Sequence, residues 1–112
     1  MLRTFDVAAL AATQGGEYVL GMKDLYTHAC YMIYGIMQPG EGQRLVKPGD
    51  GHEEILCAVD GDLEIHSEKG DFILRRGHAT HVKEDQSFFL ANPSDKPVVY
   101  IMAGGHCRPH HH

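Results

Sequence analysis

The sequence is poor in cysteine, with three residues in 112, Cys30, Cys57 and Cys107, and none of them is closely paired with another. An odd number of widely spaced cysteines is not typical of the disulfide frameworks that hold small secreted domains together. Cys30 and Cys57 lie in apolar runs, so we expect both to be buried thiols that act as small hydrophobic side chains. The cysteine content therefore favours a reducing, cytoplasmic environment.

Long apolar runs are also absent. No stretch approaches the roughly 20 consecutive apolar residues that cross a bilayer. Residues 1–6 lack the apolar core and the small-residue cleavage site of a signal peptide. We therefore expect no membrane partner and a cytoplasmic location.

Positive charge is scarce, and the formal net charge is −5. Lys and Arg do not cluster, since the closest pair is Arg75 and Arg76. Phosphate binding requires a basic face, and two residues do not make one. The charge pattern excludes nucleic acid as an expected partner.

Glycine is abundant, with 13 residues that punctuate short apolar segments. Turn residues separate segments rich in aromatic and branched side chains at intervals of about 8–12 residues, which is typical of an all-β sandwich or barrel. The strands predicted in this way cover residues 17–22, 28–37, 43–47, 53–59, 62–66, 71–75, 79–83, 87–91 and 98–102.

The length of 112 residues suits one domain with one core. Only residues 7–12 read as a helix, for which Asp6 is a suitable N-terminal cap. We therefore predict a single domain with an N-terminal arm over residues 1–16, a barrel over residues 17–103 and a His-rich tail over residues 104–112.

Several predicted strands are apolar on both faces, and residues 55–59 show this most clearly. One face of such a strand fills the barrel, but the other face also needs cover. Because a second chain commonly supplies that cover, we predict a homodimer.

Two segments carry a family resemblance. In residues 52–62, Glu54 is separated from Gly61 of a tight turn by six residues, and in residues 70–81, Gly70 precedes His81 by eleven positions. This order and spacing resemble the two motifs of the cupins, in particular the small conserved-barrel, cupin-2-like proteins, over about 65 of the 112 residues. The resemblance implies a jelly-roll barrel, a double-stranded β-helix, in which segments 49–61 and 70–85 face each other across a cavity.

The resemblance also implies a metal site, but the first motif is degenerate. In metal-binding cupins this motif supplies two histidines and a glutamate, and the second motif supplies one histidine. Glu54 and His81 match this pattern, whereas Pro48 and Asp50 occupy the positions of the two first-motif histidines. Proline has no ligating side chain, but Asp50 offers an oxygen donor.

His52 provides a substitute ligand on the same strand. Alternate residues of a strand share a face, so Asp50, His52 and Glu54 would point inward together, with His81 approaching from the facing strand. This set suits Fe, Mn, Ni or Zn with room for a substrate. In the alternative interpretation, a histidine and a glutamate form a hydrogen-bonded pair that lines a polar cavity without metal. We expect His66 and His78 to lie on the surface or the rim.

The tail contains Cys107 and four of the nine histidines, three of them in the run His110–His112. Clustered histidines bind Ni, Cu or Zn. The run is also compatible with the remnant of a purification tag or with a flexible, solvated end. A third possibility is that the tail turns back at Gly104-Gly105 and places a histidine near the mouth of the barrel.

Two functions are compatible with these features. The first is a metal-dependent oxygenase or isomerase that acts on a small polar metabolite, with a carboxylate or histidine moving a proton. The second is a non-catalytic barrel that binds a small molecule or a metal ion, which Pro48 and Asp50 favour. Tyr31, Tyr34 and His78 are possible substrate contacts that no motif distinguishes.

Overall fold

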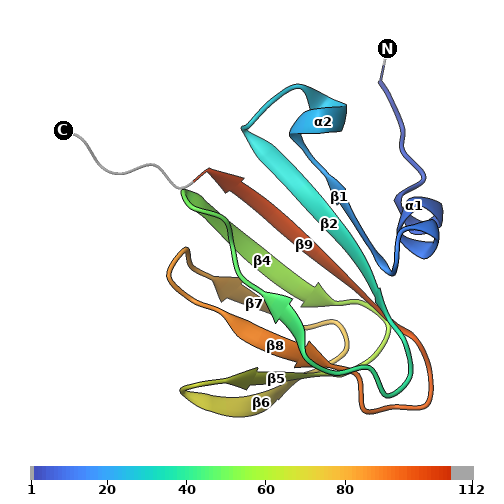
Figure 1. Ribbon diagram of the computed structural model, residues 1–112, viewed down its shortest axis with the longest axis vertical. Helices are drawn as coiled ribbons and strands as arrows, with labels where there is room; N and C mark the ends of the chain where they lie inside the picture. Colours follow the sequence, from blue (N-terminus) through green and yellow to red (C-terminus); the bar gives the residue numbers. More distant parts are fainter. Residues whose placement is uncertain (1, 107–112) are drawn as a thin grey trace.

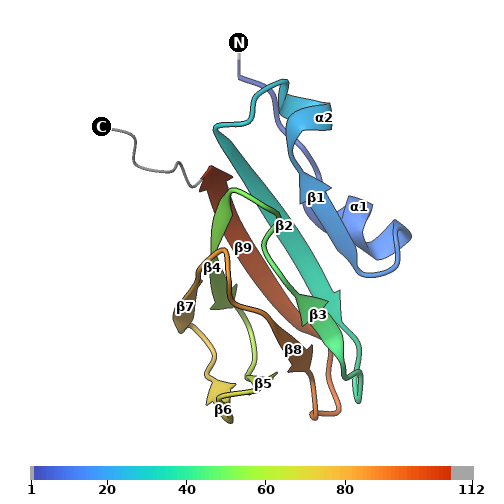
Figure 2. The same cartoon turned by 60° about the vertical axis from the view of Figure 1, so that its left-hand side comes forward.

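The computed structural model describes residues 2–106 and contains two antiparallel sheets that form two layers (Figures 1 and 2). The larger sheet has the strand order β1 (Glu17–Leu20), β2 (Cys30–Met37), β9 (Val98–His106), β4 (His52–Ala58) and β7 (Ala79–Val82). The smaller sheet has the order β3 (Arg44–Val46), β8 (Phe88–Ala91), β5 (Leu63–Ser67) and β6 (Gly70–Leu74). The predicted all-β fold is confirmed.

The predicted N-terminal helix is confirmed as α1 (Val7–Thr13), and Asp6 caps it by accepting a hydrogen bond from the backbone N–H of Ala9. A second short helix, α2 (Met22–Leu25), interrupts the strand predicted to reach residue 22. Asp24 of α2 accepts a hydrogen bond from the Tyr18 hydroxyl at 2.9 Å. The apolar pattern that predicts the strand gives no sign of this hydrogen bond, which joins residues six positions apart.

Both helices lie beside β1, away from β5 and β6 (Figure 1). Within the described residues, neither helix has the length and hydrophobicity required to cross a membrane.

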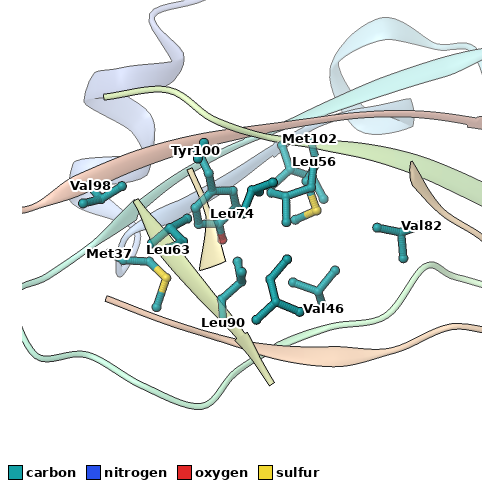
Figure 3. Close-up of a cluster of buried hydrophobic side chains, with 13 residues drawn as sticks. Met37, Val46, Leu56, Leu63, Leu74, Val82, Leu90, Val98, Tyr100 and Met102 are labelled. Atoms are coloured by element: carbon teal, nitrogen blue, oxygen red, sulfur yellow. The ribbon is translucent and has the colours of Figure 1, made fainter. Parts of the chain in front are cut away.

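The core is built from rows of inward-facing residues on β2, β9 and β4. Ile33, Met102 and Leu56 are partners across these strands, and all three side chains are buried. Figure 3 shows that core side chains from both sheets meet in the space between the layers. The smaller sheet and its neighbours contribute Val46, Leu63, Ile65, Leu74 and Leu90.

Tyr100 connects several strands at one end of the barrel. Its ring lies across Gly35, and a Cβ atom at that glycine would come within 2.0 Å of Cζ of the ring. The Tyr100 hydroxyl donates to Glu17 and accepts from Arg44. Burial, together with the bond to Glu17, raises the pKa of Tyr100 above its ordinary value. Arg44 also binds Glu41 at 2.6 Å, so one network joins β1, β3 and β9.

The outer face of the larger sheet remains apolar and exposed. Ile55 is 53% exposed there, and it borders a groove of about 590 Å³ that also touches Ala79 and Ala103. This exposed face agrees with the reason for predicting a homodimer, which stays a prediction. Cys30 also faces outward and is exposed, and Cys57 is partly exposed, so the expectation that both thiols are buried is wrong. Their apolar neighbours cover the other face of each strand.

Candidate functional site

At the other end of the inner face, a polar row replaces the apolar rows of the core. Tyr31, Gly104 and Glu54 are partners across β2, β9 and β4. The Tyr31 hydroxyl donates a hydrogen bond to Oε2 of Glu54 at 2.6 Å. A Cβ atom at Gly104 would come within 2.3 Å of Cζ of Tyr31, so only glycine lets the ring cross β9 and reach the carboxylate. The register of three strands thus creates this pair.

Glu54 as a whole residue is only 5% exposed, and a buried carboxylate is costly unless it receives hydrogen bonds. The Tyr31 hydroxyl supplies one. Burial, followed by the bond to Glu54, raises the pKa of Tyr31 above its ordinary value. Tyr31 is therefore a protonated donor at neutral pH. Among the described residues, no buried side-chain nitrogen or oxygen atom lacks a partner.

Histidines form the next layer toward the end of the sheet. His52 on β4 and His106 on β9 are direct strand partners, and their ring centroids are 4.9 Å apart. The His52 ring also lies 5.4 Å from the Tyr31 ring. His28, in the segment before β2, has its ring 5.6 Å from that of His106. Three chain segments therefore bring imidazoles to one end of the barrel, next to the Tyr31–Glu54 pair.

A cavity of about 300 Å³ opens at this end. Its polar side chains include Tyr31, His52 and Glu54, and its apolar wall includes Val19 and Met22. His28, Thr27, Cys30, Gly21 and Gly49 complete the lining. The cavity therefore combines a buried acceptor, a phenolic hydroxyl and an imidazole within an otherwise partly apolar wall.

The structure does not bring the four predicted metal ligands together. His52 and Glu54 alternate along β4 and share its inner side, as expected. Asp50 is exposed in the turn before β4. His81 is paired with Ile55, which faces outward, and Nε2 of His81 lies 2.7 Å from Oε1 of the Glu53 carboxylate. Over residues 2–106, no group of three or more His, Cys, Asp or Glu side chains is arranged to hold an ion.

The expected approach of His81 across the cavity is wrong because β7 is the hydrogen-bonded neighbour of β4 in the same sheet. Directly paired residues on neighbouring strands of one sheet point to the same side of that sheet. Ile55 and His81 are such a pair, so His81 points outward with Ile55. Segment 70–74 does lie in the other sheet, but it forms a hairpin with β5. The donor set implied by the resemblance therefore does not fit a metal ion, and no metal-dependent step follows from it.

The second-motif segment begins in a hairpin and ends in β7. Gly70, which begins the spacing to His81, belongs to the β5–β6 hairpin. Gly77, in the turn before β7, has φ +79°, a left-handed conformation that favours glycine. The spacing from Gly70 to His81 therefore spans two different sheets.

From the sequence alone, Tyr31 is one of several possible substrate contacts, and His106 belongs to the predicted tail. In the structure, β9 continues through Gly104 and Gly105 to His106, so the strand ends three residues after the predicted limit of the barrel. Its alternation with Ile33 on one strand indicates that Tyr31 points to the inner face. Only the register between β2 and β9 shows that Gly104 is its partner. Cys107 and His110–His112 lie outside the described residues.

Comparisons with known proteins place the fold but not the function. No protein-family model and no curated protein matches the sequence. A conserved double-stranded β-helix protein from Klebsiella pneumoniae is similar in structure, with a TM-score of 0.71 and 18% identity over 96% of this chain and 93% of that one. A cupin 2 conserved barrel domain protein from Salinispora arenicola gives a TM-score of 0.70 and 17% identity over 94% and 87%.

A sugar phosphate isomerase of the cupin superfamily from Silicibacter pomeroyi is also similar, with a TM-score of 0.63 and 17% identity over 92% of this chain and 67% of that one. At identities this low, the shared property is the fold. The chain therefore has the cupin double-stranded β-helix fold that its paired motifs suggested.

Proposed function

Starting from this cupin fold, we propose that the protein binds a small hydroxyl-bearing metabolite, of the size of a monosaccharide, at the histidine end of its barrel. The observation that carries the proposal is the buried Tyr31–Glu54 pair, with its bond of 2.6 Å, beside His52 in a cavity of about 300 Å³. Small-ligand sites typically combine apolar walls with a few fixed polar groups, and their volumes begin at about 300 Å³.

The chemistry of the three polar groups favours hydroxyl groups in the ligand. A carboxylate is an acceptor with about four lone-pair sites, of which Tyr31 uses one on Glu54. A ligand hydroxyl can donate to a remaining site and accept from an imidazole, because His52 offers either role according to its tautomer. Neighbouring hydroxyls of one small ligand are well suited to such a set.

Of the two functions predicted from the sequence, this geometry supports the non-catalytic binding barrel better than the metal-dependent oxygenase or isomerase. Such an enzyme with Fe, Mn, Ni or Zn requires ligands that converge, whereas Asp50 is exposed in the turn before β4 and His81 lies on the outer face with Ile55. The isomerase from Silicibacter pomeroyi shares only the fold, so its substrate class is not transferred to this chain.

The test is a ligand screen by ¹H–¹⁵N correlation spectra on EDTA-treated protein, with monosaccharides and their phosphates as probes. Binding should shift the amide signals of residues 28–31, 52–54 and 104–106. Tyr31→Phe and Glu54→Gln should each weaken binding about tenfold, which corresponds to the loss of one good hydrogen bond. The matched control is Glu53→Gln, which changes the neighbouring carboxylate on the outer face.

Binding that is as strong in Glu54→Gln as in the parent would contradict the proposal, and so would shifts confined to the outer face around Ile55 and His81. The predicted homodimer is tested on the same samples by light scattering. A mass of twice that of the chain is the expected result.

A further inference from the structure

A second cavity, of about 360 Å³, is lined by residues of both sheets on the side of β6 and β7. β6 is an edge strand of the smaller sheet and β7 is an edge strand of the larger sheet, and both lie away from the helices (Figure 2). The two sheets are therefore not joined by strand pairing here, and side chains of the β5–β6 hairpin, of β7 and of the segment before β8 surround the space. None of these residues lines the cavity at the histidine end.

The inner wall of this second cavity is aromatic. Phe72 on β6 is the strand partner of the buried Ile65, so its side chain lies on the inner side of the sheet, and it is nevertheless 50% exposed. Phe88 on β8 is the partner of the buried Val46 and is only partly covered by the core. Both phenylalanines line the cavity. The core thus leaves inward-facing aromatic surface free for a ligand.

The rim of the cavity carries more negative than positive groups. Glu68 and Lys69 lie in the turn of the β5–β6 hairpin, and Asp85 lies in the turn after β7. Two carboxylates and one ammonium group give the rim a formal charge of −1. Within residues 2–106, none of these three side chains forms an ion pair. His81 also borders the cavity, but its Nε2 is bound to Glu53.

We propose that this second cavity binds a small organic cation with an aromatic body, of the arylalkylamine class. The face of a phenylalanine ring attracts a cation, and the attraction increases as water is excluded. The aromatic body would pack on Phe72 and Phe88, with the ammonium group toward the carboxylates of Glu68 and Asp85 at the rim. The volume of about 360 Å³ lies within the range of small-ligand sites, which begins at about 300 Å³.

The test uses three probes with similar aromatic bodies and different charges at neutral pH. They are 2-phenylethylamine, which is a cation, 2-phenylethanol, which is neutral, and 3-phenylpropionate, which is an anion. Each is titrated into the full chain and followed in ¹H–¹⁵N correlation spectra. The amine should shift amide signals within residues 65–72 and 80–88. It should bind about threefold more tightly than the alcohol, as expected for a partly exposed ion pair, and the anion should bind most weakly.

The aromatic wall is tested at Phe72. Phe72→Ala should weaken binding of the amine about tenfold, because the cation loses a ring face. Phe72→Leu keeps an apolar side chain and should also weaken binding, which shows that the ring itself is required. Ile73→Ala is the matched control, since Ile73 is the next residue on the same strand, is 51% exposed and faces outward with Glu64. Circular dichroism and thermal unfolding show whether each variant is folded.

The rim is tested by the Glu68→Gln/Asp85→Asn double variant. It should bind the amine and the alcohol equally, with the affinity for the alcohol unchanged from the parent. A general disturbance of the fold would weaken the binding of both probes, so this result is specific to the charge of the rim.

Three results would overturn the proposal. They are the absence of amine binding at millimolar concentration, equal binding of the three probes, and a folded Phe72→Ala variant that binds the amine as tightly as the parent. Amide shifts confined to residues 28–31 and 52–54 would also overturn it, because the probe would then occupy the histidine end. The metabolite proposal does not depend on any of these results, since Tyr31 and Glu54 belong to the other cavity.

Discussion

The Tyr31 ring crosses Gly104 and donates its hydroxyl proton to Glu54 at 2.6 Å, while at the other end of the same sheet the Tyr100 ring crosses Gly35 and donates to Glu17. In both cases a glycine on the neighbouring strand provides the space, and a carboxylate two strands away accepts the bond. The inner face of the sheet therefore has a polar contact at each end and an apolar core between them.

Removal of the Tyr31 hydroxyl should destabilise the protein. In Tyr31→Phe, the buried Glu54 carboxylate loses its donor, and an unsatisfied buried acceptor costs about 1–3 kcal/mol. Urea unfolding of Tyr31→Phe, Glu54→Gln and the double variant measures the coupling between the two side chains. Tyr34→Phe is the control on the same strand. Coupling near zero would contradict the importance of this bond.

Gly104→Ala should destabilise the protein by about 1–3 kcal/mol, because the new methyl group would overlap the Tyr31 ring and force it or the strand to move. Gly42→Ala is the control, since a Cβ atom there meets only an ordinary contact, at 3.7 Å from Cβ of Ala91. Thermal unfolding of both variants makes the comparison. Equal unfolding midpoints for the two variants would mean that the Tyr31 ring does not require a glycine at position 104.

Stability should decrease at alkaline pH because of Tyr31 and Tyr100. Burial and carboxylate partners raise the pKa of both above the ordinary value of about 10. Their contribution to the free energy of unfolding is thus fully present below pH 10. It is lost as the pH rises from 10 toward the folded-state pKa, because the unfolded chain releases these protons first. In a titration followed by tyrosine absorbance, fewer than the five tyrosines should ionise near pH 10 while the fold persists.

Measurement of the alkaline loss in Tyr31→Phe and Tyr100→Phe separates the two contributions. Each variant should lose less stability than the parent between pH 9 and pH 11. A parent whose five tyrosines all titrate together near pH 10, while circular dichroism remains native, would contradict the pKa shifts.

His81→Ala should leave metabolite binding unchanged. His81 lies on the outer face with Glu53, on the opposite side of the sheet from Glu54. Exposed pairs of this kind contribute little to stability. The measurement is the ligand titration by ¹H–¹⁵N spectra proposed above, with His52→Ala as the positive control. Loss of metabolite binding in His81→Ala would support the inward position that the second-motif spacing suggested.

Several elements followed from local sequence alone. Asp6 caps α1 as predicted, and the strand segments around Ile33, Leu56 and Leu90 were found from alternation and turn residues. Alternation also placed His52 and Glu54 on the same side of β4. These features depend on neighbours within a few residues, so a single segment carries the required pattern.

The position of His81 did not follow, because it depends on which strands pair. The same is true of the contacts of Tyr31 with Gly104 and of His52 with His106, which join residues more than 50 positions apart. The spacing from Gly70 to His81 could not show that Gly70 belongs to the smaller sheet while His81 belongs to the larger sheet, beside β4.

The sequence by itself determined an all-β barrel with a capped N-terminal helix, because strand alternation, glycine turns and helix caps act locally. Strand alternation also predicted that the Glu54 side chain would point to the inner face. The tertiary structure alone decided what surrounds that carboxylate. The register of β2, β9 and β4 places Tyr31, His52 and His106 at one end, and the pairing of β7 with β4 turns His81 to the opposite face. Strand order and register are long-range properties, and a shift of one residue would reverse every side chain.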